Sequence, residues 1–149
     1  MGRDETPLSI FIVIRKAFNT VDFQTLLSRM ESLGVRGKCL KWFESYLTGR
    51  SLKVVLNDVS SAAFSVTHGV PQGSVLGPLV YLIYVDLMRL YLKDVCLNSF
   101  ADDTVLTVFA SSVKDLVRKA NLALERLEIL TSLSLLCLNV RKTFLITFL

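Results

Sequence analysis

Two neighbouring aspartates, Asp102 and Asp103, stand between two apolar runs, and this arrangement restricts the fold of the chain more than any other feature. The runs cover residues 95–101 and 105–110, and apolar runs joined by a very short polar link predict a β-hairpin. A two-residue hairpin turn usually holds Asn-Gly, Asp-Gly or Gly-Gly, because its central residues need a positive φ. Adjacent carboxylates are a poor choice for such a turn, so they indicate either a separate chemical task or a solvated acidic turn.

The chemical task that suits adjacent carboxylates is the binding of a hard divalent cation. Polymerase sites hold magnesium with one or two carboxylates and with the phosphates of the substrate. The pair therefore predicts a metal site for phosphoryl or nucleotidyl transfer. A turn that is merely acidic remains the alternative on these residues alone, because short motifs also occur by chance.

Composition and charge limit the class of protein. A chain of 149 residues fits one domain with a real core, and 52% hydrophobic against 20% charged residues excludes a disordered chain. The net charge of +4 is uneven, since residues 1–57 carry nine Lys/Arg and five Asp/Glu while the remainder carries eight of each. A basic first third beside an acidic pair is typical of a protein that holds a polyanion near a metal, although an ordinary solvated basic face is the alternative.

The cysteines and the uncharged stretches exclude further classes. Cys39, Cys96 and Cys137 are far apart in apolar surroundings, which predicts small core residues rather than metal ligands or disulfides, in a reducing intracellular compartment. His68 is the single histidine, so a His-based catalytic set or zinc site is not expected. No membrane span is expected either, because glycines and prolines interrupt residues 62–85 and the stretch 129–140 is too short.

The order of elements predicts an α+β fold, an antiparallel sheet with helices packed on one face. Residues 8–14 form a continuous apolar run, typical of a strand buried on both faces. Asp22, Ser74 and either Ser111 or Ser112 are placed to cap helices. In the last helix the residues expected to face inward are Val113, Leu116, Val117, Ala120, Leu124 and Leu127. The expected helices are 23–33, 37–47, 75–92 and 113–130, and the expected hairpins pair 51–56 with 63–67, 95–101 with 105–110, and 135–140 with 144–149.

Three sequence blocks stand in a characteristic order, namely residues 69–79 (GVPQGSVLGPL), 100–104 (FADDT) and 138–143 (LNVRKT). In order and spacing they resemble the reverse transcriptase of non-LTR (LINE-type, Jockey-like) retrotransposons. Residues 16–22 (KAFNTVD) resemble in part a fourth block, Lys-Ala-Phe-Asp. The resemblance covers nearly the whole chain, and it implies a single palm-like domain over residues 1–149, with fingers and thumb absent.

The resemblance also implies partners, a cofactor and catalytic residues. An RNA-directed DNA polymerase works on an RNA template, a DNA primer and a dNTP, and it uses two Mg²⁺ or Mn²⁺ ions in nucleotidyl transfer. By position, Asp102 is the direct metal ligand and Asp103 the supporting carboxylate. Lys142 faces the triphosphate as a general acid or charge partner.

Other residues acquire binding roles from the same resemblance. Phe18 is expected under the ribose, where it excludes a 2′-hydroxyl, and Gln72 and Gly73 are expected to line the incoming nucleotide and template. Arg15 and Lys16 are expected to meet phosphate, with a solvated surface role as the alternative.

The chain departs from the family at the first strand. The family's metal-binding aspartate stands three residues before the lysine of the Lys-Ala-Phe-Asp block, where this chain has Val13. Asn19 replaces the later aspartate of that block, and Asp22 lies too far along the chain to substitute for either. Two hypotheses follow: a catalytically impaired relic that at most binds nucleic acid, or a polymerase module with residual activity.

Overall fold

The computed structural model describes residues 5–100 and 103–147, and the chain divides into two compact units. The sheet unit contains the described residues up to Ala17 and those from Val85 onward. The inserted unit is Phe18–Tyr84. The expectation of a single palm-like domain over residues 1–149 concerns the family's domain and stays a prediction.

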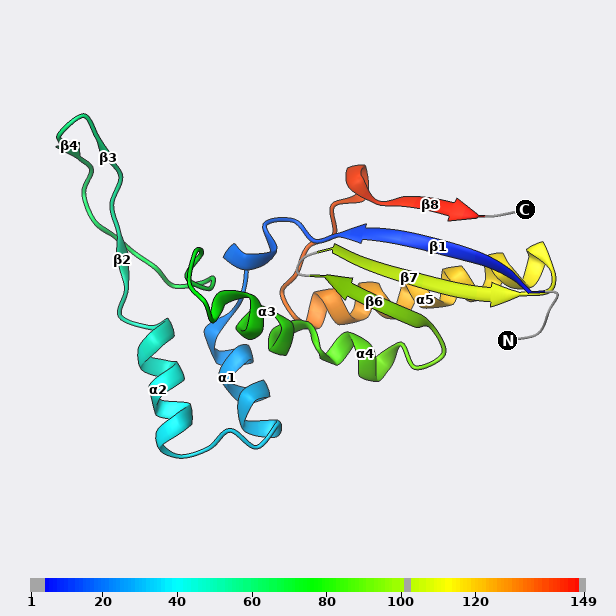
Figure 1. Ribbon diagram of the computed structural model, residues 1–149, viewed down its shortest axis with the longest axis horizontal. Coiled ribbons are helices and arrows are strands. Elements are labelled where there is room, and N and C mark those ends of the chain that lie inside the picture. Colours follow the sequence, from blue (N-terminus) through cyan, green and yellow to red (C-terminus); the bar gives the residue numbers. More distant parts are fainter. Residues whose placement is uncertain (1–4, 101–102, 148–149) are drawn as a thin grey trace. The chain divides into compact units, whose positions relative to one another are not determined.

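The sheet unit is built on a four-stranded antiparallel sheet with strand order β6-β7-β1-β8 (Figure 1). The long helix α5 packs on one face of it, so the predicted fold class is confirmed. The strands are β1 (Thr6–Val13), β6 (Cys96–Phe100), β7 (Asp103–Ala110) and β8 (Phe144–Thr147), and the helices are α4 (Leu87–Tyr91), α5 (Val113–Leu133) and the 3₁₀ turn η2 (Val140–Lys142).

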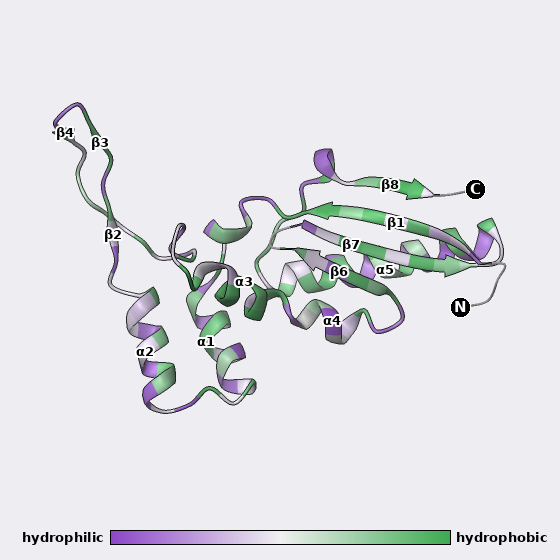
Figure 2. Cartoon of the chain, in the orientation of Figure 1, coloured by the Kyte–Doolittle hydropathy of each residue, from purple (hydrophilic) through white to green (hydrophobic). Residues whose placement is uncertain are grey.

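The two faces of β1 differ in burial. Leu8, Ile10 and Ile12 are buried on the face that α5 covers, and the apolar character of β1 and β7 is visible in Figure 2. Ser9, Phe11 and Val13 are only half-buried on the open face, so the expectation of burial on both faces is wrong. The open face still has its own contacts, because the Phe11 ring stacks on Phe144 at 4.7 Å.

Helix α5 begins where expected, and three of its predicted inward positions, Leu116, Ala120 and Leu127, are buried. The side chain of Ser112 accepts a hydrogen bond from the Asp115 amide at 3.2 Å and caps the helix. Val113 and Val117 are 64% and 50% exposed, so the expectation that they face inward is wrong. The buried stripe passes through Leu116, Ala120, Ala123, Leu127 and Leu130.

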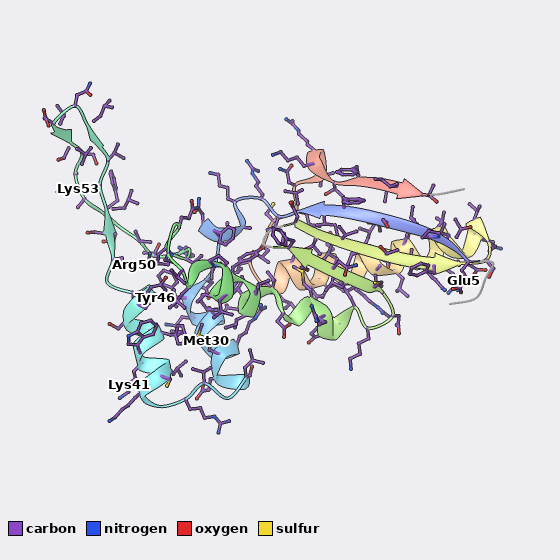
Figure 3. The ribbon with its side chains drawn as sticks, in the orientation of Figure 1. Glu5, Met30, Lys41, Tyr46, Arg50 and Lys53 are labelled. Atoms are coloured by element: carbon purple, nitrogen blue, oxygen red, sulfur yellow. The ribbon has the colours of Figure 1, made fainter. Side chains whose placement is uncertain are left out.

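The inserted unit is mainly helical. Asp22 caps α1 by accepting a hydrogen bond from the Thr25 amide at 2.8 Å, as predicted, and Gly34 after the helix has φ +95°. Met30, labelled in Figure 3, is fully buried with Leu26 and Leu47. The helices are the 3₁₀ turn η1 (Ala17–Asn19), α1 (Phe23–Ser32), α2 (Lys38–Leu47) and α3 (Gly77–Val85).

The predicted hairpin of the inserted unit is present, but its turn is tighter than expected. Asn57 and Asp58 both have positive φ, at 45° and 66°, which is the requirement of a two-residue hairpin turn. Residues 51–65 are exposed throughout. The paired strands are β2 (Ser51–Leu52) with β5 (Phe64–Ser65) and β3 (Val55–Leu56) with β4 (Val59–Ser60).

Three further expectations differ from the structure. Residues 135–140 form no strand partner for β8; Leu138 makes an isolated bridge to Ile14, and β8 pairs with β1 instead. The helix expected to end near Leu92 is interrupted at Asp86. Cys39, Cys96 and Cys137 are free and exposed rather than in the core.

No helix among the described residues is long and apolar enough to cross a membrane.

Candidate functional site

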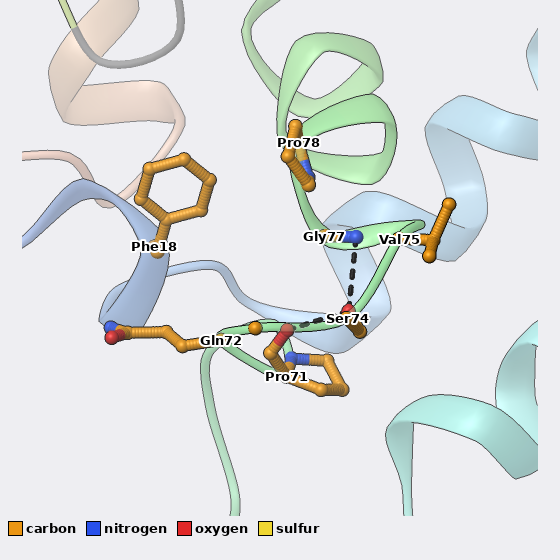
Figure 4. A pocket seen from close by; sticks show the side chains of 8 residues that line it. Phe18, Pro71, Gln72, Ser74, Val75, Gly77 and Pro78 are labelled. Atoms are coloured by element: carbon orange, nitrogen blue, oxygen red, sulfur yellow. Dashed lines mark hydrogen bonds between the residues drawn. The ribbon is translucent and has the colours of Figure 1, made fainter.

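The inserted unit contains a cavity of about 410 Å³ at the start of α3 (Figure 4). This volume lies within the usual range for small-molecule sites. Three residues with predicted binding roles, Phe18, Gln72 and Gly73, lie together in its wall. The full lining consists of Phe18, Pro71, Gln72, Gly73, Ser74, Val75, Gly77 and Pro78.

Gly69 brings the cavity loop against η1. Its amide donates to the Val21 carbonyl at 2.8 Å, and the next amide, of Val70, donates to the Phe18 carbonyl at 2.9 Å. A Cβ at Gly69 would come within 2.9 Å of both the Asn19 Cα and the Phe18 carbonyl oxygen. Gly69 also has φ +85°, so only glycine permits this close backbone approach.

The Ser74 hydroxyl holds the loop in shape. Its Oγ donates to the Pro71 carbonyl at 2.6 Å and accepts from the Gly77 amide at 3.1 Å (Figure 4). The Tyr46 hydroxyl donates to the same oxygen at 2.7 Å. The expectation that Ser74 caps this helix holds only for its bond to the Gly77 amide, because α3 begins at Gly77, three residues beyond Ser74. The one hydroxyl joins the loop, α2 and α3.

The two side chains at the mouth of the cavity have fixed partners. The Phe18 ring packs against the fully buried Tyr81 ring, with centroids 4.7 Å apart. Gln72 Nε2 donates to Asn19 Oδ1 at 2.6 Å. The cavity therefore presents one aromatic face and one amide whose position is set by a neighbouring amide.

Asp22 lies between η1 and α1 and is the N-cap of α1. Partial burial by itself raises the pKa of its carboxyl, but hydrogen bonds from Thr25 and the nearby His68 outweigh burial and leave the pKa below its ordinary value. The Asp22 amide donates to the Tyr84 hydroxyl at 3.3 Å, and burial raises the pKa of that phenol. Asp22 is thus a helix cap held ionised by its surroundings.

The end of β1 at Val13 and the start of β7 at Asp103, here called the acidic edge, lie in the sheet unit. Val13 is directly opposite Asp103 in the antiparallel register. Directly opposite residues share a face of the sheet, with Cβ atoms about 4.5–5.5 Å apart. The shared face is the open one, because Ile12 and Thr104 next to them are buried on the α5 side.

The predicted phosphate-binding cations belong to the same edge. The Asn139 amide, just before η2, donates to the Val13 carbonyl at 2.8 Å, and the Lys142 amide donates back to the Asn139 carbonyl at 2.9 Å. The Arg15 amide donates to the Cys137 carbonyl at 2.7 Å. The side chains of Arg15, Lys16 and Lys142 are exposed.

Comparison with known proteins gives the family. A family model described as reverse transcriptase (RNA-dependent DNA polymerase) matches residues 3–147. This chain belongs to the reverse transcriptase family. The resemblance to non-LTR, LINE-type elements is confirmed by relatives from such elements.

Two relatives and one solved structure show what this chain is similar to. A 115 kDa protein of the type-1 retrotransposable element R1DM of Drosophila melanogaster is 34% identical over 70% of this chain and 10% of its own length. The RNA-directed DNA polymerase of the mobile element jockey from the same species is 29% identical over 76% of this chain and 13% of its own length. The chain spans about a tenth of these relatives. Apo telomerase from Candida tropicalis, at a TM-score of 0.70 and 15% identity over 96% of this chain and 31% of that chain, shares the fold.

The divalent cations that the reverse transcriptase family implies do not fit the part of the acidic edge that the structure describes. Asp103 faces an apolar side chain, Val13, where a second carboxylate is needed. Residues 5–100 and 103–147 contain no group of three His, Cys, Asp or Glu side chains that could hold a metal. Asp102, the expected direct ligand, lies outside the described residues.

Three features of this reverse transcriptase's site were missed from the sequence. The Asn19–Gln72 bond, the Tyr46–Ser74 bond and the bridge between Asp22 and His68 join segments 28 to 53 residues apart. No local pattern signals such pairs.

Proposed function

We propose that this domain derives from the RNA-directed DNA polymerase of a non-LTR retrotransposon and that, with Val13 in place, it does not catalyse nucleotidyl transfer. The observation that carries the proposal is the register that sets Val13 opposite Asp103. Valine offers no charge or hydrogen bond to the reacting groups. Loss of one preorganised charge-stabilising group costs a factor on the order of 10²–10³ in kcat.

The cavity supports a binding role that is separate from catalysis. Phe18 supplies a face for the ribose and excludes a 2′-hydroxyl, and Gln72 and Gly73 line the incoming dNTP and the template. At the other site, Lys142 faces the triphosphate, and Arg15 and Lys16 meet phosphates of an RNA template or DNA primer. A polymerase module with residual activity, dependent on other parts of a longer protein, is the second candidate; the complete cavity favours it.

An intracellular setting belongs to the same proposal. The three cysteines of the chain are free and exposed, and exposed thiols persist in a reducing compartment. Whether that compartment is the nucleus or the cytoplasm is a question for localisation of the tagged chain.

Primer extension on an RNA template, with Mg²⁺ or Mn²⁺ and dNTPs, tests the proposal. Four chains are compared: the native chain, Val13→Asp, the neutral isostere Val13→Asn, and Val13→Asp combined with Asp102→Ala. We expect extension from Val13→Asp alone, because only this variant restores a carboxylate opposite Asp103 while keeping Asp102.

Extension by the native chain at the rate of Val13→Asp would refute the impairment and favour the second candidate. Mn²⁺ binding measured by electron paramagnetic resonance provides a readout that needs no other domain. We expect Val13→Asp to bind Mn²⁺ more tightly than Val13→Asn. Equal binding by these two variants would show that position 13 does not decide the metal site.

A further inference from the structure

The positive charge of the chain is concentrated around α2. Residues 36–53 contain five Lys/Arg and one Asp/Glu, whereas the rest of the chain contains twelve of each. This segment of the inserted unit therefore accounts for the whole net charge of +4. The side chains of Arg36, Lys38, Lys41 and Lys53 are exposed, and Figure 3 labels Lys41 and Lys53 on α2 and the hairpin.

A stacked aromatic pair, with Trp42 exposed and Tyr46 half-buried, lies in the middle of this basic segment. The Trp42 and Tyr46 rings are stacked, with centroids 5.5 Å apart and planes within 8°. They are one helical turn apart, and Lys38 is one turn before Trp42, so the three share a face of α2. Trp42 is 53% exposed, although an indole of this size is usually mostly buried.

The position of the aromatic pair is fixed by contacts with Ser74, which lines the cavity, and with Phe43. The Tyr46 hydroxyl donates to Ser74 Oγ, and Phe43 packs edge-on against Trp42 at 5.1 Å. Leu47 on the opposite face of α2 is fully buried. A stacked pair with a fixed base presents an indole surface that needs little ordering when a ligand binds.

Not every cation nearby is available to a ligand. Arg50 donates from Nε to the Leu47 carbonyl and from a terminal nitrogen to the Gly69 carbonyl, both at 2.8 Å, so its guanidinium serves the fold. Lys38 and Lys41 are on the exposed part of α2, beside the indole. These two lysines are the cations placed to meet phosphates around a stacked base.

We propose that Lys38, Lys41, Trp42 and Tyr46, here called the α2 platform, bind single-stranded nucleic acid, with an unpaired base stacked on Trp42. The positive charge fits a polyanion, and aromatic stacking between cationic side chains is the mode by which single strands are bound without sequence preference. A duplex fits poorly, because its bases are already stacked on one another. The inference rests on the nucleic-acid binding of the proposed function and adds a surface to it that does not depend on the acidic edge.

Trp42 is the single tryptophan of the chain, so its fluorescence reports on the proposed site. The experiment titrates the full 149-residue chain with a mixed-sequence single-stranded RNA of about twelve nucleotides, within the size range of single-strand sites. Anisotropy of a label on the RNA measures binding independently. We expect indole quenching that follows the anisotropy curve, and weaker binding with smaller quenching for the same RNA as a duplex.

Matched variants locate the binding surface. We expect Trp42→Ala to weaken binding by on the order of tenfold and Trp42→Phe to weaken it less, because Phe keeps a ring for stacking. Lys38→Ala and Lys41→Ala should each reduce the slope of log K against log salt by about 0.7. Tyr91→Ala and Lys114→Ala, which remove an exposed aromatic and an exposed cation from the sheet unit, are the controls and should change neither quantity.

The outcomes separate this inference from the proposed function. RNA binding by anisotropy without indole quenching, or with equal loss in Trp42→Ala and Tyr91→Ala, overturns the α2 platform and leaves nucleic-acid binding intact. Absence of any RNA binding overturns both the α2 platform and the nucleic-acid binding of the proposed function. A concentration-dependent blue shift of Trp42 emission without RNA would show that a second copy covers the platform, and that result also overturns the inference.

Discussion

The cavity of the inserted unit and the acidic edge of the sheet unit belong to one family's chemistry, but they differ in how the fold maintains them. At the cavity, Gly69, Ser74 and Gly77 set the backbone itself, so their loss disturbs folding. At the edge, position 13 lies on an open sheet face, and a carboxylate there would face Asp103. Like charges directly opposite each other destabilise a sheet, whereas valine favours a strand. Valine at position 13 is therefore compatible with the fold of the sheet, whereas the cavity depends on residues that set its backbone.

The largest expected effect tests whether the cavity is part of the fold. Gly69→Ala places a Cβ against backbone atoms at 2.9 Å in a left-handed conformation, and it should lower the free energy of unfolding by roughly 3 kcal/mol. Gly73→Ala is the matched control, since Gly73 has φ +78° with nothing within 4 Å of an added Cβ. Its loss should be only about 1 kcal/mol. Urea denaturation measures both, and equal losses would contradict the close approach.

The next effect concerns the cap behind the cavity. Asp22→Ala should cost about 1 kcal/mol of unfolding free energy at neutral pH, because the Thr25 amide loses its acceptor. The pKa of Asp22 is lowered in the folded state, so its ionised form stabilises the fold above the unfolded pKa of about 3.9. That contribution is lost as the pH falls through the lowered folded pKa.

The variant Asp22→Asn isolates the charge from the hydrogen bond. Its amide oxygen can still cap α1, but it does not titrate in this range. The stability difference between the native chain and Asp22→Asn should therefore shrink as the pH is lowered below about 4. A difference that stays constant from neutral to acid pH would show that the Asp22 charge makes no contribution.

A smaller effect tests the acidic edge without any catalytic assay. In the presence of a chelator, Val13→Asp should lower the free energy of unfolding by roughly 0.2–1 kcal/mol through repulsion from Asp103. Mn²⁺ should reverse this loss, because a ligand that binds only the folded state stabilises it. Val13→Asn should show no Mn²⁺ dependence beyond that of the native chain. Thermal unfolding with and without Mn²⁺ gives the answer, and an unresponsive Val13→Asp would exclude a site shared across these strands.

The smallest effect concerns the amide pair at the cavity mouth. The Gln72–Asn19 hydrogen bond is exposed, so a double-mutant cycle of Gln72→Ala and Asn19→Ala should give a coupling of about 0.5 kcal/mol in unfolding free energy. The same cycle in binding of a fluorescent dNTP tests whether the pair orients Gln72 for the nucleotide. Additive single-variant effects would mean that the bond contributes to neither.

Short-range signals in the sequence were sufficient for many elements of the fold. The cap at Asp22 was identified correctly, and Ser112 is one of the two serines expected to cap α5, because a capping side chain bonds to an amide three residues away. The hairpin formed by β6 and β7 was also predicted, since apolar runs on either side of a short link pair locally. Phe18, Gln72 and Gly73 have binding roles predicted from the family resemblance, and the structure places all three in one cavity.

The exposed side of each element was decided elsewhere in the chain. The cysteines were expected in the core because their neighbours are apolar, yet all three are exposed. Val113 and Val117 were assigned to the wrong side of α5 because they are themselves apolar. Local hydrophobicity indicates that an element has a buried face, but the packing partner selects which face that is.

By itself, the sequence determined the family and much of the order of elements, and it placed Val13 where the family resemblance implies an aspartate. Only the tertiary structure decided that Val13 lies opposite Asp103, that β8 pairs with β1, and that Asn19 bonds to Gln72. Composition and turn chemistry act over a few residues, whereas strand register and loop contacts depend on groups distant in the chain that meet only after folding. The consequence of Val13 therefore becomes visible in the register of the sheet.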